Sequence, residues 1–239
     1  MNKHTEHTRL NVCNLSVKYK RKLVLDNINF TVHTGQVVGI IGPNGAGKST
    51  LFKSILGLIP AEGQKITYGE KPLLEQRNKI AYIPQRSQID WDFPATVWDV
   101  VLMGRIAHTG WFKQFSRESY EKVQDALDRL RILHLKNCRI GELSGGQQQR
   151  VFLARSIAQE AEVFCLDEPL AGVDYKTQDI IFAILQGLSR DNKLILVIHH
   201  DLGDTIKYFD KLILLNKSLV GQGLPHEVLQ DNLLHQAYS

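Results

Sequence analysis

The sequence predicts an α/β fold built on a mostly parallel β-sheet, and two observations lead to this prediction. Short, continuous apolar runs have the length of strands that are buried on both faces. Stretches with helical periodicity, such as residues 180–188, separate the later runs, which is typical of parallel strands joined by crossover helices. The apolar runs are Val37–Ile41, Val163–Leu166, Leu194–Ile198 and Leu212–Leu215.

Other periodicities surround this core. Residues 15–19 and 28–32 alternate apolar and polar side chains, which predicts half-exposed antiparallel strands. Between about residues 86 and 160 strand signals are absent, and helical patterns begin at Thr96 and Ser116. We therefore expect one domain over residues 1–239, with an antiparallel β subdomain and a helical subdomain inserted at about residues 86–160.

Composition and charge exclude several classes of protein. The 29 Lys and Arg residues against 25 Asp and Glu give a net charge of +4, without the basic stripe that nucleic-acid binding requires. No apolar run approaches the roughly 18 to 20 residues that span a bilayer, and the N-terminus lacks a signal-peptide core. We expect a cytosolic, water-soluble chain with a reduced, buried Cys165 and with His4 and His7 in solvent.

A phosphate-binding loop follows the first buried run. Residues 42–50 fit the pattern G-x-x-x-x-G-K-[ST] between an expected strand and a helix with Leu51, Ile55 and Leu58 on one face. Glycines let successive N–H groups face phosphates at a helix N-terminus. Lys48 is expected to reach the β- and γ-phosphates and Ser49 to ligate Mg²⁺. The sequence predicts that ATP contacts Gly42, Pro43, Asn44, Gly45, Ala46, Gly47, Lys48, Ser49 and Thr50.

A carboxylate pair ends another buried run. Asp167 and Glu168 follow residues 163–166, so that a strand ending at the nucleotide would place Asp167 by Mg²⁺, directly or through water. Glu168 is then left to polarise the attacking water. The pair predicts hydrolysis of the bound nucleotide.

The order of the remaining motifs resembles that of ABC ATPases. Leu143–Gln147 (LSGGQ) is similar to the signature motif of that family, and Ala171–Asp174 resembles its loop that ends in an aspartate. The resemblance implies a P-loop NTPase with a RecA-like core. It implies that Tyr19 stacks on adenine, that Gln85 links the two lobes and senses Mg²⁺, and that His200 lies near the γ-phosphate.

The signature also has a chemical rationale. Ser144 can cap a helix through Gln147 to Gln159, whose first N–H groups and positive dipole form a second phosphate site. Gly145 and Gly146 let the backbone approach an anion. In the family this arrangement implies a head-to-tail homodimer, in which Ser144, Gly145, Gly146 and Gln147 of one subunit close over the ATP of the other. Asp174 belongs to the same nucleotide-binding set.

Several tracts resemble the ATPase subunits of bacterial manganese, zinc and iron importers. They are Pro84–Pro94, Val100–Arg105, Glu168–Asp174 and His199–Leu202. The resemblance implies a peripheral ATPase on the cytoplasmic face of the membrane, bound to two permease subunits. An extracytoplasmic binding protein would select the ion, and nucleic acid is not an expected partner. Manganese, zinc and iron are not distinguished.

Alternatives remain open at this point. Trp91, Phe93 and Trp98 would form either a docking surface for a permease helix or part of the core of their own lobe. The cargo could instead be a siderophore or cobalamin. A soluble ABC ATPase that acts on DNA or ribosomes is a further alternative, although the chain has no heptad insertion. His199 and His200 are adjacent in a strand and therefore point to opposite faces, which disfavours a metal site.

Overall fold

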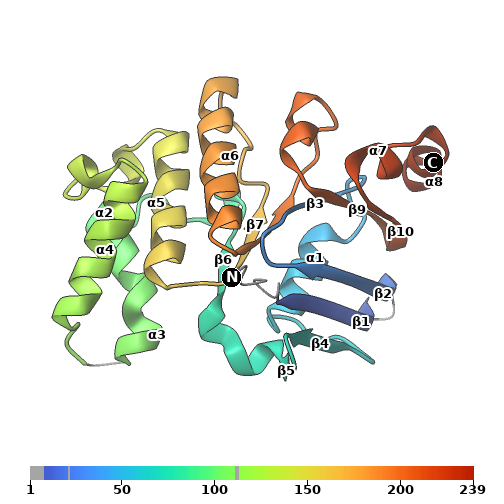
Figure 1. The fold of residues 1–239 in the computed structure, drawn as a ribbon, viewed down its shortest axis with the longest axis horizontal. Helices are drawn as coiled ribbons and strands as arrows, with labels where there is room; N and C mark the ends of the chain where they lie inside the picture. The colour runs from blue at the N-terminus through green and yellow to red at the C-terminus, as the bar shows by residue number, and fades with distance from the viewer. Residues whose placement is uncertain (1–7, 21, 111–112) are drawn as a thin grey trace, which may run out of the picture. The chain divides into compact units, whose positions relative to one another are not determined.

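The computed structural model describes residues 8–20, 22–110 and 113–239, so His4 and His7 lie outside the described residues. The chain forms two compact units (Figure 1). The first unit extends to Arg77 and resumes at Gln186–Ser239, and the second unit is Asn78–Leu185. Both units combine strands and helices, which confirms the expected α/β class.

An antiparallel sheet forms the first part of the first unit. Strands β1 (Arg9–Tyr19) and β2 (Lys22–His33) pair with each other, β4 (Lys65–Tyr68) pairs with the other edge of β1, and β5 (Lys71–Pro72) completes the sheet. Burial in β1 and β2 follows the period of two, with gaps where the register shifts. The expected antiparallel strands are therefore confirmed.

Parallel strands form the other sheet of this unit. Strand β3 (Val37–Ile41) is parallel to both β8 (Leu194–Ile198) and β9 (Lys211–Asn216), and β10 (Ser218–Gly223) is antiparallel to β9. Every residue of β3 and β8 is buried, because strands inside a sheet covered on both faces have no exposed side. This burial explains why the two sequences are continuous apolar runs.

Helices complete the first unit: α1 (Lys48–Ile55), α7 (Pro225–Val228) and α8 (Asp231–Tyr238). Helix α1 packs against β1 and β2 and buries Leu51 and Ile55 as expected. The expectation for Leu58 was wrong, since its side chain is 62% exposed. Helix α1 ends at Ile55, and Gly57 with φ of +67° turns the chain before Leu58 can join the buried face.

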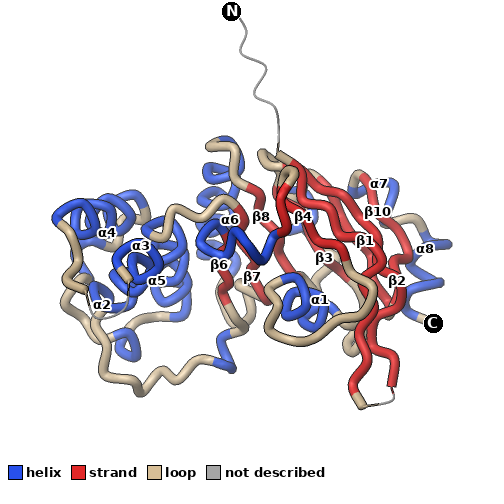
Figure 2. Tube along the Cα trace, turned by 90° about the horizontal axis from the view of Figure 1, so that it is seen from below, coloured by secondary structure: helices blue, strands red, loops and turns tan. Residues whose placement is uncertain are grey.

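The second unit joins a pair of parallel strands to a group of helices (Figure 2). Strand β6 (Ile80–Ile83) is parallel to β7 (Val163–Asp167). The helices are α2 (Val97–Leu102), α3 (Ile106–Thr109), α4 (Arg117–Arg129), α5 (Gly145–Ala158) and α6 (Tyr175–Arg190), whose last turn returns to the first unit. Helices α2, α4 and α5 pack on one another, and no strand occurs among the described residues from 86 to 160.

Side-chain caps fix the helix starts in this unit. Thr96 Oγ1 accepts a hydrogen bond from the N–H of Asp99 at 3.2 Å, and Ser116 Oγ accepts one from the N–H of Ser119 at 3.2 Å. The expected helix starts at Thr96 and Ser116 are thus confirmed. None of the helices in the described part of the chain combines the length and apolar character that a bilayer-spanning segment needs.

Candidate functional site

The phosphate loop of the first unit connects β3 to α1. Gly42 has φ of +146°, and a Cβ there would fall on the carbonyl oxygen of Leu215. Gly47 has φ of +98°, and a Cβ there would stand 2.5 Å from Leu25 Cδ2. Because both positions combine a left-handed backbone with a close neighbour, only glycine allows the loop to curl tightly into the helix.

Lys48 begins helix α1 and folds back over the loop. Its ammonium group donates hydrogen bonds to the carbonyl oxygens of Gly42 at 2.7 Å and Pro43 at 2.9 Å. The residue is 7% exposed, so the charge is held against the loop backbone. Ser49 and Thr50 follow in the first turn of the helix and are half-buried, whereas Asn44 and Gly45 are exposed. The loop therefore presents a cation and a helix N-terminus together, which suits a phosphate.

Two other residues of the first unit were expected to contact the nucleotide. His200 follows β8, and the N–H of His199 donates to Ile40 of the neighbouring parallel strand β3 at 3.0 Å. His200 is therefore at the same strand edge as Gly42, and it is exposed. Tyr19 ends β1 and is 49% exposed, so its ring is available for stacking.

His199 is packed inside the unit. It is 4% exposed, and its Nε2 lies 2.7 Å from Thr205 Oγ1. Burial, reinforced by the neighbouring His200, lowers the pKa of His199 to about 4. Its imidazole is consequently neutral at neutral pH. Among the described residues no group of three or more His, Cys, Asp and Glu side chains could hold a metal ion.

In the second unit, strands β6 and β7 bring the expected catalytic residues together. Ile83 pairs with Leu166, so the residues that follow each strand lie at the same edge. Gln85 Nε2 donates a hydrogen bond of 2.7 Å to Glu168 Oε2. Glu168 has φ of +48°, a backbone conformation that is uncommon for a residue with a Cβ and that concentrates at functional sites.

Asp167 is the most deeply buried acid of this group. It is 1% exposed, and the hydroxyl of Tyr82 donates to its Oδ2 at 3.3 Å. Burial and then the Asp167 charge raise the pKa of Tyr82, which keeps the phenol protonated as a donor. Sequence reasoning missed Tyr82. The available signal was its position on the strand that leads into Gln85.

The signature residues form the N-terminus of helix α5. Ser144 Oγ accepts from the N–H of Gln147 at 3.4 Å, and Gln147 Oε1 accepts from the N–H of Ser144 at 2.9 Å. This capping box confirms that Ser144 starts the helix. Gly145 lies beside the guanidinium of Arg86, and a Cβ on Gly146 would collide with Thr177 Cγ2.

Asp174 stands at the N-terminus of α6. Its Oδ1 accepts from the N–H of Thr177 at 3.0 Å. The hydroxyl and then the N–H of Thr177 lower the pKa of Asp174, so the exposed carboxylate is ionised. Because Thr177 also lies against Gly146, the signature is next to the first turn of α6. Asp174 therefore has a capping role in addition to any contact with nucleotide.

Packing within the unit is confirmed for two of the three aromatic residues, and the docking surface stays a prediction. Trp91 and Trp98 are half-buried within the unit, with Trp91 edge-on to Phe152 and Trp98 stacked on Tyr120. Phe93 is 55% exposed. A pocket of about 410 Å³ is lined by Gln85, Arg86, Ser87, Ile89, Trp91 and Ala171. Gln85 thus connects this pocket to Glu168.

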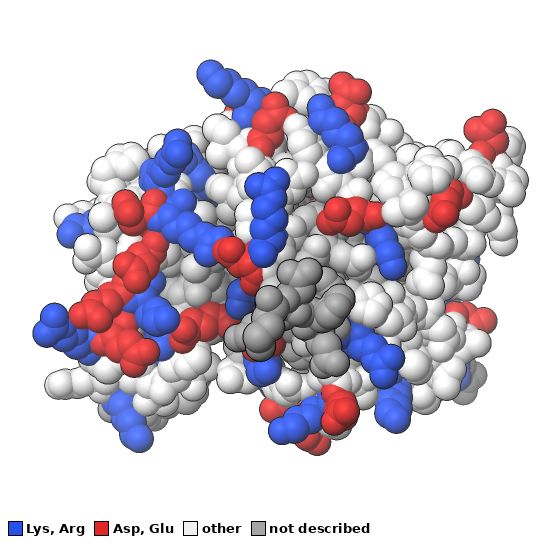
Figure 3. All heavy atoms as spheres, viewed as in Figure 1, with Lys and Arg blue, Asp and Glu red and all other residues white. Residues whose placement is uncertain are grey.

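Charge is mixed on the visible surface. Figure 3 shows Lys and Arg side chains interspersed with Asp and Glu on this face, not gathered into one basic stripe. Cys165 lies in β7 and is fully buried, and burial raises the pKa of its thiol to about 12. The thiol is therefore protonated at neutral pH, as expected for a residue that packs in the core.

Comparison with known proteins gives consistent matches over the chain. A family model described as "ABC transporter" matches residues 25–171. The manganese transport system ATP-binding protein MntB of Halalkalibacterium halodurans is 47% identical over 95% of this chain and 90% of that protein. The zinc transport system ATP-binding protein TroB of Treponema pallidum is 40% identical over 95% of this chain and 85% of that protein.

A solved structure is similar as well. An inward-facing structure assigned to the metal-chelate type of ABC transporter matches with a TM-score of 0.85 and 29% identity. The match covers 96% of this chain and 88% of the other. It confirms the P-loop NTPase fold.

Proposed function

The chain belongs to the ABC transporter family of ATP-binding proteins, and on this premise we propose that it powers the import of a manganese, zinc or iron ion through separate permease subunits. The observation that carries this proposal is the set of ATPase groups described above, in a chain whose relatives include manganese and zinc transport proteins. The cargo crosses the permease and does not bind this subunit.

ATP binding is assigned to the phosphate loop. Residues 42–50 surround the phosphates, with Lys48 on the β- and γ-phosphates. When ATP enters, its phosphates replace the carbonyl oxygens of Gly42 and Pro43 as partners of the Lys48 ammonium. Tyr19 stacks on adenine, and His200 donates to the γ-phosphate from the edge of β8.

The donor set in the chain fits Mg²⁺. The assigned ligands, Ser49, Asp167 and Gln85, offer hydroxyl, carboxylate and amide oxygens, the hard ligands that Mg²⁺ prefers. Gln85 uses its amide nitrogen on Glu168, which leaves its amide oxygen for a ligand or water. Few protein carboxylates are needed, because Mg²⁺ in such sites is held largely by substrate phosphates and water. Bound Mg²⁺ would neutralise charge that develops on the phosphates.

Hydrolysis is assigned to Glu168. Its carboxylate accepts a proton from water as the water oxygen attacks the γ-phosphorus and the bond to the ADP oxygen breaks. The hydrogen bond from Gln85 at 2.7 Å occupies Oε2 of that carboxylate until Gln85 moves. Gln85 also lines the 410 Å³ pocket, so a permease segment seated there would act on Glu168 through one side chain.

The signature residues are assigned to the interface of a dimer. Helix α5 is long enough, with 14 residues, to have a strong N-terminal dipole, and Ser144, Gly145 and Gly146 leave its start open to an anion. We assign this start to the ATP of a second copy in a head-to-tail homodimer. Binding of ATP closes the dimer, and hydrolysis reopens it.

The remaining assignments concern partners and location. The subunit would lie on the cytoplasmic face of the membrane, bound to two permease subunits, and an extracytoplasmic protein would deliver the ion. A siderophore or cobalamin is the second candidate cargo, and similarity to a metal-chelate type transporter supports it.

Substitution of the proposed base tests the function. Glu168→Gln should bind ATP and form a stable dimer but lose hydrolysis by about 100-fold or more, since it cannot accept the proton. Cells carrying it should fail to accumulate Mn²⁺, Zn²⁺ or Fe²⁺, each tested beside a ferric chelate and cobalamin. Glu121→Gln, which removes an exposed carboxylate from α4, is the matched control. Near-normal hydrolysis by Glu168→Gln would remove Glu168 as the base, and uptake that stays normal for every ion would remove the proposed cargo.

A further inference from the structure

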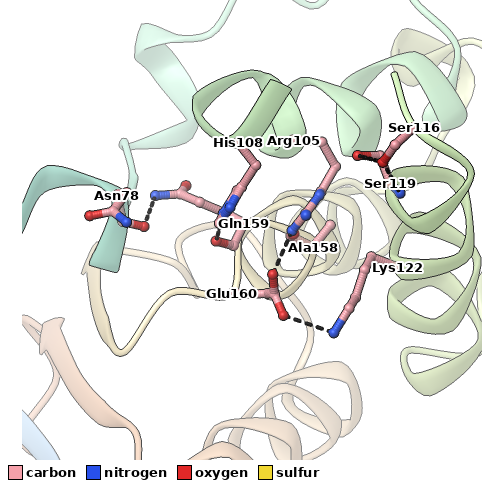
Figure 4. A network of polar contacts seen from close by, with 9 residues as sticks. All are labelled: Asn78, Arg105, His108, Ser116, Ser119, Lys122, Ala158, Gln159 and Glu160. Carbon is pink, nitrogen blue, oxygen red and sulfur yellow. Dashed lines mark hydrogen bonds and ion pairs between the residues drawn. The ribbon is translucent and has the colours of Figure 1, made fainter. Parts of the chain in front are cut away.

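A short segment of the second unit, from Gly104 to His108, is hydrogen-bonded to the C-terminal end of helix α5. Arg105 Nη1 donates to the carbonyl oxygen of Ala158 at 2.7 Å and to Glu160 Oε2 at 2.8 Å. His108 Nε2 donates to the carbonyl oxygen of Gln159 at 3.0 Å. Figure 4 shows these side chains converging on the last turn of the helix.

The position of Arg105 is costly for stability alone. The residue is 3% exposed, and its buried Nε has no hydrogen-bond partner among the described residues. Arginine is rarely buried this deeply, and an apolar residue of similar volume would avoid the desolvation. An apolar residue could not bond a terminal helix carbonyl and a carboxylate at once, as the guanidinium does beside the negative end of the helix dipole.

Glu160 also occupies a position that is unusual for its residue type. It follows the C-cap residue Gln159 and has φ of +59°, a position at which glycine is usual. Its carboxylate pairs with Arg105 and also with Lys122 of α4 at 2.8 Å. Hydrogen bonds from Lys122 and Arg105 lower the pKa of Glu160 to about 2, so the network is fully charged at neutral pH.

Gly104 sets how closely the segment approaches. A Cβ at this position would overlap the carbonyl oxygen of Arg155, which is helix backbone and cannot rotate away. Gly104 therefore lets the segment approach the backbone of α5 closely, and Arg105 is bonded to the end of that helix.

The opposite end of α5 holds the signature. At about 1.5 Å per residue, 14 residues span about 21 Å. A tilt of about 3° at the C-terminal end therefore moves the N-terminus by about 1 Å, and a misplacement of that size can cost on the order of 100-fold in a catalytic site.

We propose that Gly104, Arg105 and Glu160 are positioning residues that hold α5 at the angle at which Ser144, Gly145 and Gly146 meet the ATP of a second copy. None of the three belongs to the residues assigned above to the nucleotide or to the attacking water. The proposal rests on the head-to-tail dimer assigned above. It adds that the segment after α2 determines whether the signature can bind that ATP. This segment follows Gln85 in the chain.

ATP-dependent dimerisation tests the proposal. In a Glu168→Gln parent, light scattering gives the ATP concentration for half-maximal dimer, and a fluorescent ATP analogue gives the affinity of the monomer. Adding Arg105→Gln should raise the half-maximal concentration by about tenfold or more and leave monomer affinity within about twofold. Arg117→Gln is the matched control, because its side chain is 94% exposed on α4 and pairs with Glu121 of the same helix.

Thermal denaturation separates positioning from stability, and every measurement is made at a temperature where each variant is folded. Glu160→Gln is the second variant, since its side chain is 42% exposed and the change keeps an acceptor oxygen while removing the negative charge that Arg105 pairs with. It should raise the half-maximal concentration by about threefold. The proposal would be overturned if folded Arg105→Gln dimerised at the same half-maximal ATP concentration as the control. If Arg105→Gln does not fold, an unchanged half-maximal ATP concentration for Glu160→Gln would by itself overturn the proposal. A parent that never dimerises with ATP would instead refute the dimer itself.

Discussion

Acidification should destabilise this protein through one buried histidine. In the folded chain the pKa of His199 is about 4, mainly because burial penalises the charged ring, against an ordinary value of 6.5. Below pH 6.5 the unfolded chain binds a proton that the folded chain refuses. The contribution of His199 to stability is therefore complete above about pH 6.5 and is lost progressively as the pH falls toward 4.

The size of the loss follows from the two pKa values. Each pKa unit corresponds to about 1.4 kcal/mol. Acidification from pH 6.5 to pH 4 should therefore lower the free energy of unfolding by about 3 kcal/mol. About 2 kcal/mol of this loss falls between pH 7 and pH 5. Such a loss is a large part of the stability of an ordinary domain.

Urea unfolding at several pH values measures this loss. His199→Asn keeps an amide that can bond the hydroxyl of Thr205 but does not titrate, so its unfolding free energy should fall by about 2 kcal/mol less than that of the wild type between pH 7 and pH 5. His226→Asn, at an exposed position, should behave like the wild type. Identical pH dependence in the wild type and His199→Asn would refute the reasoning.

Two further predictions concern the nucleotide-binding residues. Gly42→Ala should lower the free energy of unfolding in urea by about 1–3 kcal/mol and weaken binding of a fluorescent ATP analogue, since alanine would need φ of +146° and its Cβ would meet Leu215. The control is Gly187→Ala, in the interior of α6 with no atom within 4 Å of its Cβ. It should leave the free energy of unfolding unchanged or raise it by up to about 1 kcal/mol. Equal losses in the two variants would contradict this account of the loop. Tyr82→Phe removes the donor to Asp167, and in a Mg²⁺ titration it should raise the concentration for half-maximal ATP hydrolysis by about tenfold. Tyr120→Phe, at a 44% exposed position, is its control, and a titration curve unchanged by Tyr82→Phe would exclude a role for that hydroxyl.

Local patterns were sufficient for most of the elements. The continuous apolar runs became the buried strands β3, β7, β8 and β9, because strand burial on both faces leaves no room for polar residues. Ser144 was expected to start a helix and does so, because capping depends on side chains within one turn of each other. Leu58 shows where such patterns fail: its spacing fits the helical face, but Gly57 ends the periodicity first.

Contacts between distant residues could not be obtained this way. Gln85 and Glu168 are 83 residues apart, and Tyr82 and Asp167 are 85 residues apart. Their contacts depend on the register of β6 against β7, which the packing of the whole unit decides. The sequence indicated Gln85 and Glu168 separately, without the hydrogen bond that joins them.

By itself the sequence determined that this chain is an α/β ATPase of the ABC type, since a phosphate loop, an acidic strand end and a capped glycine helix start are each encoded in a few consecutive residues. Only the tertiary structure decided that Gln85 restrains Glu168, that His199 is neutral and that Arg105 is buried against α5. The physical reason is the range of the interactions: caps and turns involve neighbours in the chain, whereas desolvation and the approach of charges depend on segments that folding brings together.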